Sequence, residues 1–77
     1  MKAIVNVYLK QGVLDPQGKA AHHALGSLGF KGINDVRIGK QIVLDVDSSV
    51  TTEMIKEMCE TLLANTVIED YDFELKP

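Results

Sequence analysis

The chain has 77 residues, a formal net charge of −3 at neutral pH and a single cysteine. A chain of this length forms one domain, residues 1–77, and buries only about 60% of the surface that its unfolded form exposes. The single cysteine excludes an internal disulfide, and neither a basic stripe nor a set of stacking aromatic side chains suited to nucleic acid is present. We therefore expect a marginal core, stabilisation by oligomerisation and no nucleic-acid partner.

The first segment, residues 2–10, predicts a strand. Its side chains alternate, with Ala3, Val5, Val7 and Leu9 on one face. Ile4 and Tyr8 make the other face partly apolar. Asn6 interrupts the apolar run too early for a signal peptide or a membrane span, so we expect a cytosolic protein with no membrane partner.

The next segment carries both signals of a helix that runs to Leu28. Asp15 is suited to the N-cap and Pro16 to the first helical position, where its missing N–H has no partner. Gly29 suits a left-handed position after the last turn, in a Schellman-type end in which Phe30 meets Leu25. A stripe of mostly small side chains predicts a face that packs on a sheet: Ala20, Ala21, Ala24, Leu25 and Leu28.

The segment 36–46 allows two interpretations, a hairpin that turns at Gly39-Lys40 or one long strand. A two-residue turn would pair apolar with polar residues on each face, because residues directly across a hairpin share a face. A continuous strand groups its apolar side chains, leaves only Lys40 out of pattern and lets Gly39 serve as a bend or bulge. We favour the long strand, with one end reaching into another subunit.

The second helix has an apolar stripe, preceded by a cap at Ser48, Ser49 or Thr51 and ending near Asn65. The stripe consists of Met54, Ile55, Met58, Cys59, Leu62 and Leu63. Cys59 is expected to act as a small buried hydrophobe in a reducing compartment.

A last strand with one acidic face follows, in which Val67, Tyr71, Phe73 and Leu75 form the apolar set. The predicted fold class is α+β, a β-α-β-α-β unit with two helices on an antiparallel sheet and a long bent second strand. The split β-α-β-β-α-β order is the alternative if Gly39 turns the chain.

None of the chemically suggestive residues forms a recognisable catalytic or metal site. Neighbouring helical residues diverge by about 100°, so His22 and His23 cannot bind one ion, and we expect solvated or interface histidines. The glycines around Lys19 match no phosphate-binding motif, so Asp15 to Gly18 is interpreted as a structural cap.

Two charged features have equally plain interpretations. Lys40, on an otherwise apolar strand face, extends its amine into solvent or meets an acidic group of a partner. The acidic row of Asp70, Asp72 and Glu74, with Glu69, has the spacing of a solvated or docking sheet face.

Four sequence blocks resemble the PurS family, the small subunit of phosphoribosylformylglycinamidine synthase, over nearly the whole chain. The blocks are Leu9-Lys10 with Val13-Leu14-Asp15-Pro16-Gln17-Gly18, then Val36-Arg37-Ile38-Gly39-Lys40, then Met58-Cys59-Glu60, and Leu62-Leu63-Ala64-Asn65-Thr66-Val67-Ile68-Glu69-Asp70-Tyr71. The first and last blocks are specific, whereas the second alone would be weak.

The resemblance implies a cytoplasmic complex of three kinds of subunit in de novo purine synthesis. A glutaminase subunit releases ammonia from glutamine, and a large synthetase subunit uses ATP and magnesium to convert formylglycinamide ribonucleotide into the formylglycinamidine. The small subunit is implied to carry no catalytic residue and no cofactor, to form dimers or tetramers that resemble paired ferredoxin-like halves, and to assist ammonia transfer between its two partners.

As a hypothesis, the partner contacts lie in these blocks. The residues concerned are Asp15, Pro16, Gln17, Gly18, Arg37, Lys40, Asn65, Glu69, Asp70 and Tyr71. A rival interpretation, which rests on fold analogy alone, is a small-molecule-binding regulatory domain of ferredoxin-like type.

Overall fold

Three strands and two helices make up the computed structural model, which describes residues 1–77. In chain order they are β1 (Lys2–Leu9), α1 (Pro16–Ser27), β2 (Lys40–Asp45), α2 (Thr52–Met58) with a π-helical turn η1 (Cys59–Leu63), and β3 (Glu69–Lys76). The order β-α-β-α-β confirms the prediction, and the chain does not form a hairpin at Gly39-Lys40.

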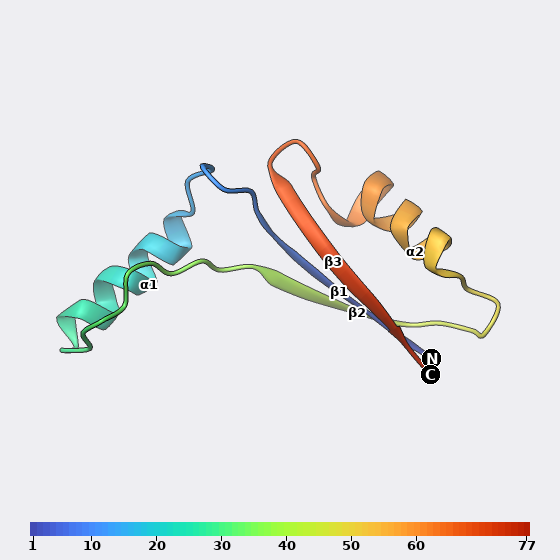
Figure 1. Cartoon of the computed structure of the whole chain (residues 1–77), viewed down its shortest axis with the longest axis horizontal. Helices are drawn as coiled ribbons and strands as arrows, with labels where there is room; N and C mark the ends of the chain where they lie inside the picture. The colour runs from blue at the N-terminus through green and yellow to red at the C-terminus, as the bar shows by residue number, and fades with distance from the viewer.

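The three strands form one antiparallel sheet with β1 in the centre, in the order β2-β1-β3. Val5 lies opposite Ile42 on one side and Phe73 on the other. The amino group of Met1 donates to the Val46 carbonyl at 3.0 Å, which extends the β1–β2 ladder. The two termini lie at the same end of the sheet (Figure 1).

One face of the sheet is covered by α2 and η1 (Figure 1), and we call it the covered face. The core between them consists of Ala3, Val5, Val7, Ile55, Cys59 and Ala64. Alternation along β1 puts its odd-numbered residues on this face, as predicted. Six buried hydrophobic residues are a small core, which agrees with the marginal stability expected from length.

Helix α2 begins as predicted but does not bury the whole predicted stripe. The Thr51 hydroxyl caps it by accepting from the Met54 N–H at 3.3 Å. Ile55 and Cys59 are fully buried, whereas Met54 is 41% and Leu62 is 82% exposed. The prediction for these last two is wrong, in Leu62's case because η1 bonds the Ala64 N–H to the Cys59 carbonyl, five residues back, which rotates the last turn.

Helix α1 has the predicted ends. Gly29 has a φ of +92°, and the Phe30 N–H bonds to the Leu25 carbonyl at 3.1 Å, as in a Schellman motif. The predicted packing of its stripe on the sheet is wrong within this chain, because α1 points away from the sheet (Figure 1). Ala20, Ala24 and Leu28 are exposed.

We call residues 11–39, made of α1 and the extended segment that returns beside it, the arm (Figure 1). The radius of gyration is 15.7 Å, whereas a compact chain of this length has about 11–12 Å. The arm therefore accounts for an elongated shape of 49 × 26 × 14 Å.

The second strand is shorter than the predicted segment 36–46. Regular pairing begins at Lys40, which lies opposite Val7, and ends at Asp45. Residues 36–39 have no neighbouring strand within the chain, and they therefore form no backbone hydrogen bonds of the sheet. The third strand likewise begins at Glu69, and Val67, predicted in its apolar face, is 82% exposed in the preceding turn.

Candidate functional site

The arm joins the sheet through two short segments, residues 9–18 and 36–40, which we call the neck. Asp15 is its central residue, and its side chain is only 4% exposed. One carboxylate oxygen accepts from the Gly18 N–H, which caps α1, and the other accepts from the Ile38 N–H, both at 2.8 Å. One side chain thus joins segments 23 residues apart.

The electrostatics of the neck favour the charged form of Asp15. The N–H groups of Ile38 and Gly18, followed by the nearby Arg37 guanidinium, hold the pKa of Asp15 below its ordinary 3.8, although burial opposes them. The carboxylate is therefore ionised in neutral solution, where its two hydrogen bonds are charge-assisted.

Arg37 binds the other side of the neck. Its guanidinium donates to the carbonyl oxygens of Val13 at 3.1 Å, Lys10 at 3.2 Å and Leu9 at 3.4 Å. These carbonyls belong to the last residue of β1 and to the loop that leads from it to α1. Arg37 therefore holds the entering segment of the arm against the returning one.

Two glycines allow the neck segments to approach closely. A Cβ on Gly18 would overlap the carbonyl oxygen of Val36 and would lie 2.9 Å from the Asp15 carboxylate. A Cβ on Gly39 would lie 2.6 Å from the carbonyl oxygen of Val7. Any larger residue at either position would push backbone against backbone.

A hollow of about 270 Å³, the neck hollow, opens beside α1's first turn. It is lined by Val7, Tyr8, Leu9, Asp15, Pro16, Gln17, Ile38, Gly39, Lys40 and Glu69. Five of the ten predicted interface residues therefore meet there, four from the two specific sequence blocks and Lys40 from the weaker one. Val7, Leu9 and Ile38 are apolar residues of the lining, and its charged residues are Lys40 and the two acidic residues Asp15 and Glu69.

Arg37 and Asp70 line a second, smaller hollow of about 220 Å³ with Tyr8, Leu9 and Gln11. Asp70 lies opposite Tyr8, on the sheet face that no helix covers, which we call the open face. The two hollows thus share Tyr8 and Leu9 at the end of β1.

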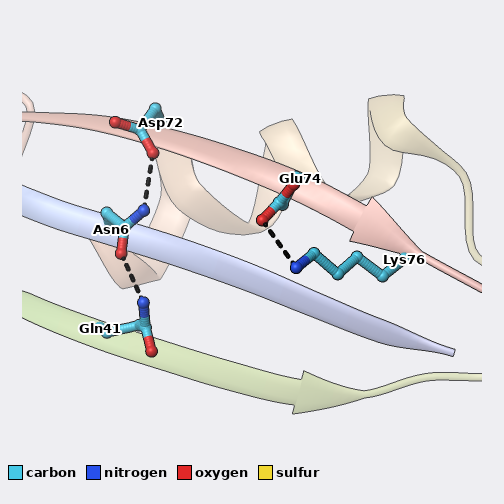
Figure 2. A network of polar contacts seen from close by, with 5 residues as sticks. All are labelled: Asn6, Gln41, Asp72, Glu74 and Lys76. Carbon is cyan, nitrogen blue, oxygen red and sulfur yellow. Dashed lines mark hydrogen bonds and ion pairs between the residues drawn. The ribbon is translucent and has the colours of Figure 1, made fainter.

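The open face carries a polar row across all three strands (Figure 2). The Asn6 amide donates to the Asp72 carboxylate at 2.8 Å and accepts from the Gln41 amide at 3.0 Å. Glu74 pairs with Lys76 at 3.3 Å farther along β3. The predicted acidic face is confirmed, and these exposed contacts orient side chains more than they stabilise the fold.

Asn65 and Glu69 hold the turn that leads into β3. The Asn65 N–H donates to the Glu69 carboxylate at 2.7 Å, and the Asn65 side-chain oxygen accepts from the Val67 N–H at 3.2 Å. This local pairing places Glu69 at the edge of the neck hollow while Asn65 remains outside its lining.

Tyr71, the remaining predicted interface residue, lies apart from the neck hollow. It lies on the covered face. Hydrogen bonding to Glu60, with partial desolvation and the charge of Glu60, raises the pKa of Tyr71 to about 12.

The raised pKa of Tyr71 predicts a titration that depends on Glu60. We expect Glu60→Gln to move the phenol from about 12 toward its ordinary 10, measured by phenolate absorbance in the near ultraviolet. Because the folded pKa is raised, the contribution to stability is complete below pH 10 and is lost as the pH rises through 12. Glu57→Gln, one turn earlier on α2, is the control; an equal change in both variants would contradict the contact.

His22 has a structural contact and His23 is exposed. A ring nitrogen of His22, Nε2, lies 2.7 Å from the Ile33 carbonyl oxygen and thereby joins α1 to the returning segment. No group of three or more His, Cys, Asp or Glu side chains is placed to hold a metal ion. Cys59 is buried in the core as predicted, and burial raises the pKa of its thiol.

The site is suited to contact with a partner surface, because Asp15, Arg37 and Glu69 are oriented by hydrogen bonds to backbone groups. Sequence reasoning missed Ile38, whose N–H binds Asp15, and the Val7 and Leu9 side chains in the hollow. The glycine in the run Ile38-Gly39-Lys40 was a sequence indication of the neck, since a glycine within a strand pattern marks a place where another segment of backbone approaches closely. None of the helices is long and apolar enough to cross a membrane.

Comparisons with known proteins agree on one family. The model of the PurS family, phosphoribosylformylglycinamidine (FGAM) synthase, matches residues 2–77. The PurS subunit of that synthase from Bacillus subtilis is 52% identical over 77 residues, covering 97% of this chain and 92% of the relative. The Mycobacterium leprae subunit is 50% identical over 70 residues, covering 91% and 89%.

Solved structures show the same fold. The B. subtilis PurS structure in its C2 crystal form has a TM-score of 0.87 at 51% identity and covers 99% of this chain and 98% of that one. A chain of the PurLQS structure from Thermotoga maritima has a TM-score of 0.83 at 31% identity, covering 95% and 93%.

Proposed function

The chain belongs to the PurS family of FGAM synthase subunits, and on this premise we propose that it is the small, non-catalytic subunit of that enzyme in purine biosynthesis. The reaction is the ATP-dependent conversion of formylglycinamide ribonucleotide and glutamine into the formylglycinamidine and glutamate. We assign catalysis, ATP and magnesium to the large subunit, no cofactor to this chain, and the cytoplasm as its location.

One observation carries the proposal for this chain beyond its family: the arm exposes more apolar surface than one copy can cover. Leu14, Leu28 and Phe30 are 62%, 74% and 60% exposed, and all belong to the arm. Such side chains, together on one projecting element, are typical of a surface that another polypeptide covers.

We propose that a second copy of the chain is one such polypeptide. None of the backbone–backbone hydrogen bonds outside the helices and strands involves residues 33–39, a segment that continues directly into β2. Side chains bind only the Ile33 carbonyl and the Ile38 N–H. An antiparallel pair of these segments around a two-fold axis near Gly39 would bind the remaining backbone groups of both copies. The α1 stripe of each copy would then cover part of the other's sheet.

The proposed partners beyond the dimer are the glutaminase and the large synthetase subunit. The T. maritima structure, whose chain resembles this one, is of a PurLQS complex. Free ammonia is mostly protonated in neutral water and is lost to solvent, so two active sites that exchange it must be held together. We propose that the neck and the Asn65 to Asp70 turn carry these contacts.

The test is FGAM production by the cognate synthetase and glutaminase, with and without this chain, from glutamine or from ammonium chloride. We expect glutamine-driven synthesis to require the chain and ammonia-driven synthesis to persist without it. If neither rate depends on the chain and no complex forms, the proposal fails. A ligand-induced rise in Tm of the isolated chain would then favour a regulatory small-molecule domain, with the neck hollow as its site.

A further inference from the structure

The direction of the arm relative to the sheet depends on few residues. The main packing contacts join β1 to β2 and β3, and α2 to η1, whereas α1 has no comparable contact with the sheet or with α2. What joins the arm to the rest of the chain is therefore the neck.

The neck has the features of a rigid joint. Both oxygens of the buried Asp15 carboxylate are bound, one within the arm's helix and one to the returning segment at Ile38. Arg37 binds three carbonyls of the entering segment. At Gly18 and Gly39 the backbone is too close to a neighbouring carbonyl to admit a side chain.

We infer that the neck fixes the direction of the arm before the synthetase and the glutaminase bind, with Asp15 as the residue that locks it. A buried carboxylate with two backbone donors has one arrangement that satisfies all three groups, and opening the neck leaves each without a partner. Only the consequence of this inference rests on the proposed function. An arm that is already ordered loses little conformational entropy when the complex assembles.

Residual dipolar couplings of the full chain test the inference, since they report how α1 lies relative to the sheet. In the wild type, one alignment tensor should fit the amides of α1 and of all three strands. In Asp15→Asn an NH2 group replaces one of the two oxygens, and because it only donates it cannot accept from the second backbone N–H. We expect the α1 couplings to become smaller relative to those of the sheet, so that one alignment tensor no longer fits both.

Asp35→Asn, an exposed position in the same returning segment, is the matched control and should behave as the wild type. Unchanged couplings of the β1 amides would show that Asp15→Asn remains folded. Arg37→Met is a second variant that should open the neck, because it removes the guanidinium. Wild-type couplings that need separate tensors, or variants with an unchanged α1, would overturn the inference. A preset arm combined with a failed synthesis assay would overturn the proposed function alone.

Discussion

Replacing Gly18 with alanine should lower glutamine-driven FGAM synthesis by at least about tenfold, the loss that 1.4 kcal/mol of assembly energy produces. The added Cβ would overlap the Val36 carbonyl oxygen and lie 3.0 Å from Cγ of Asp15. Neither atom belongs to a flexible side-chain end, so the two neck segments must separate and the Asp15 bridge to Ile38 must break. Ammonia-driven synthesis should persist, because the change is remote from the proposed catalytic subunit.

Gly26→Ala is the control for this prediction because it makes the same change in the same helix. A Cβ on Gly26 has no atom within 4 Å, and alanine is favoured over glycine in a helix by about 0.5–1 kcal/mol. We expect unchanged synthesis and a slightly higher Tm. Equal activity of the two variants would show that close approach at the neck is dispensable.

The ends of α1 could be predicted because their causes lie within a few residues. The Asp15 cap reaches Gly18, three residues on, and the Schellman bond joins Phe30 to Leu25. The preference of a residue for a capping position arises from this local backbone geometry. The apolar face of the sheet followed similarly from alternation, which places Val5 and Phe73 on the same face.

The direction of α1 could not be predicted, because amphipathicity shows that a stripe is to be covered but not by which chain. The bond that turns the helix away joins Asp15 to Ile38, and no local pattern specifies a pairing across 23 residues. The limited burial of Leu62 has a similar origin, since a π-helical turn shifts the phase of every later residue.

The candidate site, too, could be predicted only in part. The blocks around Asp15 and Glu69 were selected from sequence, and the structure brings them together at one hollow. Tyr71 is the last residue of the second block, Asn65 to Tyr71, but it points to the opposite face from Asp70, as neighbours in a strand do. Its contact with Glu60 on η1 depends on tertiary packing, which sequence spacing alone does not reveal.

A second large effect is expected from Ile55→Ala, in the core. Ile55 is fully buried and is among the largest of the six buried hydrophobic residues. Truncation of such a side chain costs about 2–5 kcal/mol, while the core of a domain this small rarely supplies more than about 3–5 kcal/mol. We expect the isolated variant to be largely unfolded, with a Tm at least roughly 10 °C lower by circular dichroism.

Leu62→Ala, on the same segment but 82% exposed in the structure, should change stability by no more than about 0.5 kcal/mol. If both variants lose equal stability, the π-helical turn does not orient the core as described. Because association stabilises only the folded chain, the Tm of Ile55→Ala should rise with its own concentration and with added partner subunits. A Tm independent of both would mean that the exposed arm contributes nothing to the stability of the assembled protein, and the proposed dimer would lose its main physical reason.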